Sequence, residues 1–121
     1  MEPLFAPGEA PLRAEIETIP LRVGTDAGIR DLAALEDGRL LVLAGPARNG
    51  LSAPYTLSIA ELPSGRLTPV GILEPVRGQD EDGKTVSGKP EAIVRLGPGR
   101  VLVLFDSLRN GAPHEYALPI P

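Results

Sequence analysis

Apolar residues in this sequence gather in short runs that are separated by turn signals. Residues 12–19 alternate between apolar and polar side chains, which is the pattern of a strand with one solvated face. Residues 40–44 are apolar throughout, as expected for a strand that is buried on both faces. A buried helix is the alternative for this run, but its short length between two turns favours the strand. The pattern therefore predicts a chain of short β-strands.

The turn signals predict how the first of these strands pair. Residues 29–36 and 39–44 flank Asp37-Gly38, a dipeptide that tolerates positive φ and favours a tight antiparallel hairpin. Residues 55–62 and 67–73 flank a Pro-Ser-Gly-Arg turn and predict a second hairpin. Together these segments make one four-stranded antiparallel unit.

The chain also contains an internal repeat. Residues 35–57 align without a gap with residues 96–118, and about half of the aligned positions are identical. The second copy predicts a hairpin from residues 91–96 and 100–105, and a further strand over residues 116–120. A repeated unit of this kind cannot bury its apolar faces alone and stacks on its neighbours.

Four-stranded antiparallel units that stack face to face are the blades of β-propellers. We therefore expect an all-β fold made of two four-stranded antiparallel blades of a β-propeller. The expected division is an N-terminal tail over 1–11, an outer strand over 12–23 that completes a blade, blade one over 28–73, a polar connection over 74–88, and blade two over 89–121, which lacks an outer strand of its own.

Two blades cannot close a ring, because propellers have ~4 to 8 blades around a channel. Either the chain is part of a longer protein that supplies the missing blades, or copies of it assemble head to tail. Three copies would give a six-bladed ring in which each chain forms one third and its N-terminal strand completes a neighbour's blade. The expected partners are therefore missing blades or copies of the chain itself.

Composition narrows the function classes. The absence of cysteine excludes disulfides, cysteine-zinc sites and thiol catalysis. A net charge of −4 and an aromatic content of 3% argue against nucleic acid as a partner. The start has no signal-peptide pattern, and no apolar run approaches the ~18 residues that span a membrane. The sequence as written predicts a cytoplasmic protein without a membrane partner, unless it is part of an exported protein.

Polar residues that differ between the two copies are the candidates for a site, because shared residues serve the scaffold. Arg30 aligns with Glu91, and Gly45 aligns with Asp106. Hairpin geometry brings the start of the first strand beside the end of the second, so one rim collects these side chains at the mouth of the expected channel. The ligand-binding candidates are Arg30, Asp31, Lys89, Glu91 and Asp106. The alternative is a network of ion pairs between blades, Arg30 with Glu91 or Asp106 and Lys89 with Asp31.

Metal binding has limited support in the sequence. Glu91 and Asp106 could hold a Ca²⁺ ion with backbone carbonyls and water, although two carboxylates are too few to define a site. Residues 79–84 have some of the acidic spacing of an EF-hand, but they lack its glycine and its helices and are predicted to form a solvated turn. His114 has no nucleophile motif beside it and is expected in an exposed loop. No catalytic residue is assigned.

The residues that precede and follow the predicted hairpin turns resemble those of a known family. Segments 28–32, 41–46 and 89–91, together with Asp106, stand in the order and spacing of a bacterial family of propeller-like proteins, domain-of-unknown-function family 3616. The resemblance covers about residues 18–121. It implies a β-propeller that is distantly similar to esterase-like phytase and lactonase propellers, and a position in the C-terminal part of a longer protein.

The expected function is a binding or scaffold module with a polar site at the channel mouth, which would accept a small-molecule ligand. The alternative is a metal-assisted hydrolase of phosphate or other esters. In that case a cation held by Glu91 and Asp106 would activate water, and Arg30 or Lys89 would stabilise an oxyanion. Whether the protein is an enzyme is left open, and a module that serves self-assembly alone is a third possibility.

Overall fold

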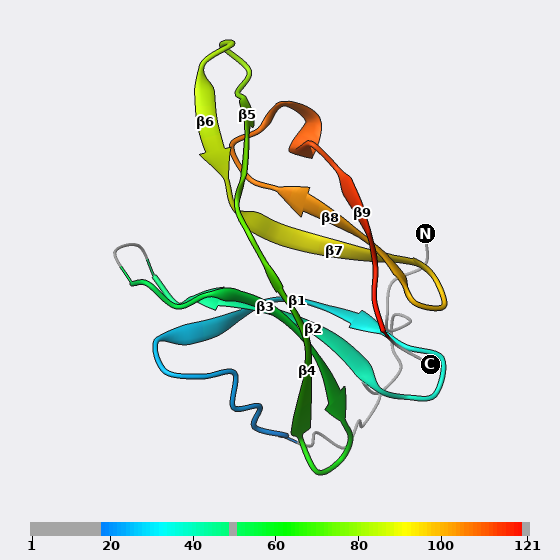
Figure 1. Ribbon diagram of the computed structural model, residues 1–121. Coiled ribbons are helices and arrows are strands. Elements are labelled where there is room, and N and C mark those ends of the chain that lie inside the picture. The colour runs from blue at the N-terminus through cyan, green and yellow to red at the C-terminus, as the bar shows by residue number, and fades with distance from the viewer. Residues whose placement is uncertain (1–17, 49–50, 120–121) are drawn as a thin grey trace, which may run out of the picture.

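The computed structural model describes residues 18–48 and 51–119, and it confirms an all-β fold with almost no helix (Figure 1). The strands are β1 (Ala27–Ala34), β2 (Leu40–Pro46), β3 (Tyr55–Glu61), β4 (Arg66–Leu73), β5 (Val76–Gln79), β6 (Thr85–Gly88), β7 (Pro90–Gly97), β8 (Arg100–Phe105) and β9 (His114–Ala117). A single 3₁₀ turn, η1 (Arg109–Gly111), precedes β9 in the described part of the chain. No helix among the described residues is long and apolar enough to cross a membrane.

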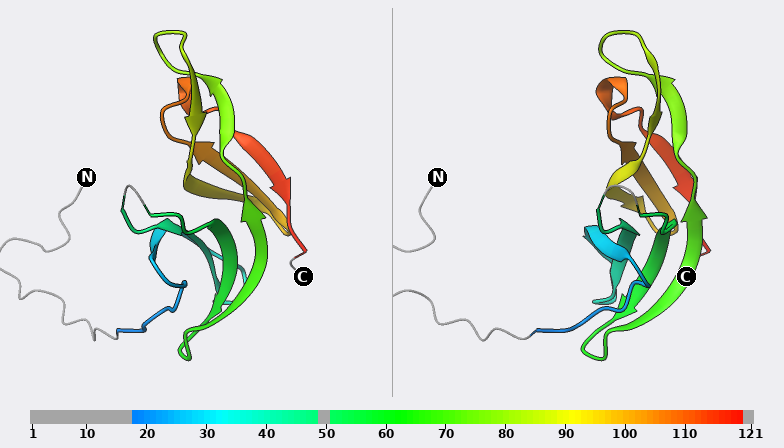
Figure 2. Two further views of the ribbon diagram at one scale, coloured as in Figure 1. Left: turned by 60° about the vertical axis from the view of Figure 1, so that its left-hand side comes forward. Right: turned by 90° about the vertical axis from the view of Figure 1, so that its left-hand side faces the viewer.

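The strands form three antiparallel sheets. The first sheet has the order β1-β2-β3-β4, the second sheet has the order β7-β8-β9, and β5 pairs with β6 in a separate hairpin. Figure 2 shows the two larger sheets stacked on each other, with β4 leading into β5 along one side of both. Neighbouring strands in each sheet are consecutive in the sequence, so short turns are enough to connect them.

The β1–β2 turn forms where the sequence predicts it. Gly38 has a φ of 82°, a conformation that glycine adopts without strain. The backbone N of Leu35 donates to the carbonyl oxygen of Arg39 at 2.8 Å, which closes the turn, and the Asp37 carboxylate accepts a hydrogen bond of 2.7 Å from Arg39 Nε within it. This turn aligns the apolar run of β2 with β1, and residues 41 to 44 are at most 2% exposed.

The hairpins β1–β2 and β7–β8 have the same register. Leu32 pairs with Val42 in the first hairpin, and Ile93 pairs with Val103 at the equivalent place in the second. Each hairpin has an irregularity near its start, which leaves Arg30 unpaired in β1 and Glu91 unpaired in β7. These two candidate site residues therefore occupy equivalent positions in the two hairpins. A bulge of this kind redirects the side chain of the extra residue.

The third strand of the second sheet differs from its counterpart. Leu43 pairs with Leu57 in the first sheet, so the repeat would place Leu118 opposite Leu104. Instead His114 pairs with Val103, and β9 begins two residues before the predicted strand and ends at Ala117. The η1 turn, in which Asn110 has a φ of 54°, makes the β8–β9 connection tighter. Residue 120, the predicted end of this strand, lies outside the described residues.

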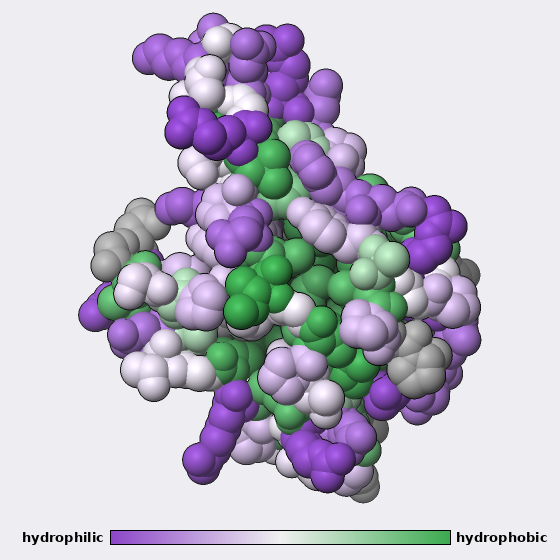
Figure 3. All heavy atoms as spheres, in the orientation of Figure 1, coloured by the Kyte–Doolittle hydropathy of each residue, from purple (hydrophilic) through white to green (hydrophobic). Residues whose placement is uncertain are grey.

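The core lies between the first and second sheets. Side chains from both sheets and from the loop after β8 make it up: Leu41, Leu43, Tyr55, Leu57, Ile59 and Leu73 from the first sheet, Ile93, Val101, Val103 and Phe105 from the second, and Leu108. On the face that Figure 3 shows, hydrophobic residues gather on the surface in the middle of the molecule, and hydrophilic residues cover the tip of the β5–β6 hairpin. The two sheets therefore bury each other's apolar faces.

The segment 74–88, expected as a polar connection, contains the β5–β6 hairpin. Its turn is closed by Asp80, whose Oδ1 accepts 2.9 Å hydrogen bonds from the backbone N of Asp82 and of Lys84. Leu108 packs against this hairpin, because an added Cβ at Gly78 or Gly88 would come within 3.2 Å or 2.5 Å of its side chain. A mostly polar sequence can form this hairpin because its contact with the core comes from two partly buried valines, Val76 and Val86, and from the glycine backbone that Leu108 covers.

The predicted outer strand at 12–23 falls mostly outside the described residues, which begin at residue 18. Residues 18–23 belong to no strand and run beside the β3–β4 turn. There the carbonyl oxygen of Pro20 lies so close to Gly65 that an added Cβ would meet it at 2.6 Å. Pro20 also lacks an N–H group, which disfavours regular strand pairing at this point.

Candidate functional site

A solvent-open hollow of about 680 Å³ lies at the end of the sheets where β1 begins and β2 ends. We call it the rim hollow. It is lined by three of the five predicted site residues, Arg30, Lys89 and Asp106, and by Tyr55 and Arg48. The remaining lining comes from the β2–β3 connection: Pro46, Ala47, Leu51, Ser52 and Ala53.

Arg30 is held in the rim hollow by contacts with both sheets. Its Nε donates a hydrogen bond of 3.1 Å to the carbonyl oxygen of Pro90 on β7. Its guanidinium lies 5.7 Å from the centroid of the Tyr55 ring, within the range of a cation–π contact. The terminal nitrogens Nη1 and Nη2 have no hydrogen-bond partner among the residues the structure describes.

Tyr55 forms one wall of the hollow because residue 45 is glycine. A Cβ at Gly45 would lie 2.6 Å from Tyr55 Cδ1 and 3.0 Å from Arg30 Cδ. Burial raises the pKa of the Tyr55 hydroxyl, the positive charge of Arg30 opposes this, and the negative charge of Asp106 adds to it. The hydroxyl therefore keeps its proton at neutral pH and is able to donate a hydrogen bond.

Lys89 and Asp106 are joined through backbone groups. The backbone N of Lys89 donates to Asp106 Oδ1 at 2.9 Å, and the backbone N of Asp106 donates to the carbonyl oxygen of Lys89 at 2.9 Å. These two bonds fix the start of β7 beside the end of β8. The Lys89 ammonium takes no part in them, and Lys89 is exposed.

Asp31 and Glu91 do not line the rim hollow. Asp31 links the two sheets, because its Oδ2 accepts a hydrogen bond of 2.8 Å from the backbone N of Ile93, and its Oδ1 accepts one of 2.8 Å from Leu32. Glu91 is exposed at the β7 bulge. The structure therefore brings together three of the five predicted residues and places the other two on the neighbouring strand surfaces.

The ion pairs considered from the sequence are not formed. In the part of the chain that the structure describes, no oxygen of Glu91 or Asp106 lies within 4.0 Å of an Arg30 nitrogen, and none of Asp31 lies within that distance of the Lys89 ammonium. The four ion pairs found there join other residues: Arg39 with Asp37, Arg66 with Glu61, Arg95 with Glu36, and Arg100 with Glu115.

The described residues contain no cluster of three or more His, Cys, Asp or Glu side chains that could hold a metal ion. The rim hollow contains one carboxylate and three cationic side chains. The acidic segment 79–84 forms the β5–β6 turn. His114 is exposed, but it begins β9 instead of lying in a loop, and its ring packs edge-on against Phe105 with centroids 5.2 Å apart.

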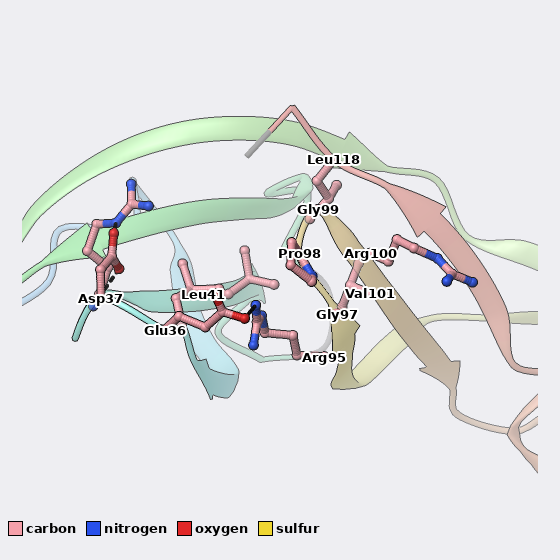
Figure 4. Close-up of a pocket in the computed structure, with 12 residues that line it drawn as sticks. Glu36, Asp37, Leu41, Arg95, Gly97, Pro98, Gly99, Arg100, Val101 and Leu118 are labelled. Carbon is pink, nitrogen blue, oxygen red and sulfur yellow. Dashed lines mark hydrogen bonds and ion pairs between the residues drawn. The ribbon is translucent and has the colours of Figure 1, made fainter. Parts of the chain in front are cut away.

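A second hollow, of about 500 Å³, lies at the opposite end of the sheets between the β1–β2 and β7–β8 turns (Figure 4). The charged groups that line it are already paired. Arg95 Nη2 lies 2.7 Å from Glu36 Oε1 across the hollow, and the hydrogen bond from Arg39 lowers the pKa of Asp37. Arg100 pairs with Glu115. This end of the sheets therefore presents satisfied charges, in contrast to the rim hollow.

Sequence reasoning missed two residues of the rim hollow. Arg48 and Tyr55 are identical in the two copies, so the rule that shared residues serve the scaffold excludes both from a site. Gly45 is the signal that could have identified Tyr55. The second copy has Asp106 at the position of Gly45, and the missing side chain of the glycine leaves room for the Tyr55 ring.

No family model, curated protein or solved structure matches this chain.

Proposed function

We propose that this chain is a binding module for a small anionic ligand, built on two blades of a β-propeller. The observation that carries the proposal is the imbalance of charge in the rim hollow. Arg30, Arg48 and Lys89 line it with a single carboxylate, Asp106, and the ion pairs of the described residues involve none of these four. The chain as a whole is acidic, so this local excess of positive charge runs against its composition.

The shared register of the two hairpins supports the propeller part of the proposal. Both have a bulge at the same place and both present apolar residues at equivalent positions. The first and second sheets also pack face to face, as successive propeller blades do. The resemblance to family 3616 remains a prediction, with the longer protein that it implies.

The donors of the hollow suit a phosphate or a carboxylate. A guanidinium offers several N–H groups in one plane. Nη1 and Nη2 of Arg30, which have no hydrogen-bond partner among the described residues, could donate to two oxygens of one anion. The Lys89 ammonium adds a flexible positive charge, and the Tyr55 hydroxyl adds a neutral donor. Because Arg30 is fixed by Pro90 and Tyr55, little side-chain freedom is lost when it binds.

The same charges weigh against the metal-assisted hydrolase. A Ca²⁺ ion needs six to eight oxygen ligands, and nearby cations oppose its binding. Of the two carboxylates proposed to share an ion, Asp106 lines the hollow and Glu91 does not. The hydrolase remains the alternative that the experiment must separate from anion binding.

Titration calorimetry with inorganic phosphate tests the proposal. We expect saturable binding at low ionic strength that weakens as salt is added, because the site is exposed. Lys89→Gln should weaken it by about 3- to 10-fold, the loss of one exposed charge-assisted contact. Lys84→Gln, a matched change at the distant β5–β6 turn, should leave it unchanged.

Absence of phosphate binding, or equal effects of the two lysine variants, would overturn the proposal. A parallel titration with calcium chloride separates the alternative. Calcium binding that is lost in Glu91→Gln would favour the metal-assisted hydrolase instead.

A further inference from the structure

The exposed apolar side chains of this chain are concentrated on two faces. Six large apolar residues of the described part are exposed: Ile29, Leu32, Leu62, Ile72, Val94 and Leu96. Ile29, Leu32 and Ile72 share the face of the first sheet that points away from the core, as their pairing with Ala44, Val42 and Thr56 shows. Val94 and Leu96 belong to the outward face of the second sheet. Only Leu62 lies in a turn.

The core between the sheets shows what such faces contact. The inward face of the first sheet carries Ala33, Leu35, Leu41 and Leu43, and it packs on the face of the second sheet that carries Ile93, Val101, Val103 and Phe105. The repeat then assigns a counterpart to each set. Val94, Leu96, Leu102 and Leu104 correspond to the first set, and Leu32, Leu40, Val42 and Ala44 correspond to the second.

Each outward face is thus the counterpart of a face that is buried inside the chain. The outward face of the second sheet corresponds to the inward face of the first, and the outward face of the first corresponds to the inward face of the second. Both outward sets are apolar throughout. On the first sheet Val42 and Ala44 are already buried within the chain, at 0% and 2% exposed, so the accessible part of its outward face lies along β1. Within the chain, β7 makes its contacts with the first sheet along β1 and β2. The exposed strips are likewise centred on β1, at Ile29 and Leu32, and on β7, at Val94 and Leu96.

We propose that a second copy of this chain docks on these faces, with β7 of one copy against β1 of the next. The contact is heterologous, since different faces of the two copies meet, and it leaves an unused face at each end. Repetition therefore either closes a ring or extends a filament. Three copies would bring together six of the larger sheets, two from each copy, which lies within the ~4 to 8 blades of closed propellers.

The contact between copies should be weaker than the contact within the chain. Arg30 and Asp31 provide the polar links from β1 to β7 inside the chain. Their counterparts, Glu91 and Ala92, cannot make the same links, because a carboxylate cannot donate to a carbonyl oxygen and alanine has no acceptor. Assembly therefore depends on apolar burial alone and should depend on concentration.

The proposal is tested by sedimentation equilibrium of the full chain as its concentration is raised from the micromolar to the millimolar range. We expect the mean mass to rise above the 12.7 kDa of one chain. Leu96→Glu should suppress the rise, because it places a charge in the apolar contact. Leu62→Glu is the matched control, since Leu62 is 44% exposed and Leu96 is 45% exposed, and it should assemble as the native chain does.

A single 12.7 kDa species at every concentration would overturn the proposal. So would equal suppression by the two variants, provided that circular dichroism shows both to be folded. A variant that fails to fold is replaced by Val94→Lys, which changes the same face. The phosphate titration is independent of this measurement, so the two proposals stand or fall separately.

Discussion

The carboxylate of Asp31 joins the two sheets by accepting a hydrogen bond of 2.8 Å from the backbone N of Ile93. This bond satisfies a half-buried backbone donor at the place where β7 lies against β1. Asp31 therefore serves the structure, although the sequence made it a candidate for a ligand site.

Replacing Asp31 with alanine should destabilise the fold. The change leaves the backbone N of Ile93 without its acceptor, at a cost of about 1–3 kcal/mol in the free energy of unfolding. Urea unfolding measures the change. Asp82→Ala, in the exposed β5–β6 turn, is the control and should stay within about 0.5 kcal/mol of the native chain. Equal stability of the two variants would show that the Asp31 bond contributes nothing.

Gly45→Ala should disrupt the rim hollow and the fold together. Its Cβ would lie 2.6 Å from Tyr55 Cδ1, so the ring or the strand must move, at a cost of about 1–3 kcal/mol. Gly71→Ala is the matched control on β4, where an added Cβ meets nothing within 4 Å. We expect thermal melting to show a loss only for Gly45→Ala, with weaker phosphate binding in the same variant.

The alkaline titration of Tyr55 reports on its two charged neighbours. Burial raises its pKa above the ordinary value of about 10. The folded state therefore keeps this proton longer than the unfolded state. The stabilising contribution is complete below the unfolded pKa and is lost as the pH rises through the raised one.

In a Tyr116→Phe background Tyr55 is the only tyrosine, because the chain has two. Arg30→Met should raise the pKa of Tyr55 further, since the Arg30 charge lowers it, and Asp106→Asn should lower it. Ultraviolet absorbance measures both shifts. An unchanged pKa in Arg30→Met would contradict the placement of its guanidinium over the ring.

Leu108→Ala should release the β5–β6 hairpin. Leu108 is 6% exposed and packs over Gly78 and Gly88. Its truncation should cost about 2–4 kcal/mol, as for other buried leucines. Hydrogen exchange should show lost protection in β5 and β6 while β2 and β3 remain protected. Leu62→Ala, at an exposed turn, should change neither protection nor stability.

The sequence was sufficient for the elements that depend on local signals. Asp37-Gly38 and the apolar run of β2 predicted the first hairpin, since a tight turn and a doubly buried strand each leave a pattern within a few residues. The β5–β6 hairpin was missed because it has only Val76 and Val86 packed against the core among polar residues, and the rest of its apolar contact comes from Leu108, distant in sequence. The register of β9 was missed because it depends on the η1 turn, and not on the alternation of its own residues.

The candidate site was predicted in part for a similar reason. Hairpin geometry correctly brought Arg30, Lys89 and Asp106 to one end of the sheets. It could not show that the β7 bulge leaves Glu91 outside the hollow, or that Asp31 turns to the backbone of Ile93. Whether a residue lines the hollow depends on the direction of its side chain, and a bulge of one residue in a strand changes that direction.

Disulfide trapping between copies tests most directly whether the outward face of the second sheet of one copy docks on the outward face of the first sheet of the next. Within the chain, Asp31 lies beside Ile93. The repeat gives Ala92 and Leu32 as the counterparts of these two residues. The proposed contact therefore places Ala92 of one copy beside Leu32 of the next. The chain has no cysteine, so Leu32→Cys and Ala92→Cys add single thiols to a clean background. Mixing the two variants under mild oxidation should give a crosslinked pair that contains one of each, and neither variant alone should crosslink to the same extent. Crosslinking of Ala92→Cys with itself in preference to the mixed pair, or no crosslinking at all, would contradict the account.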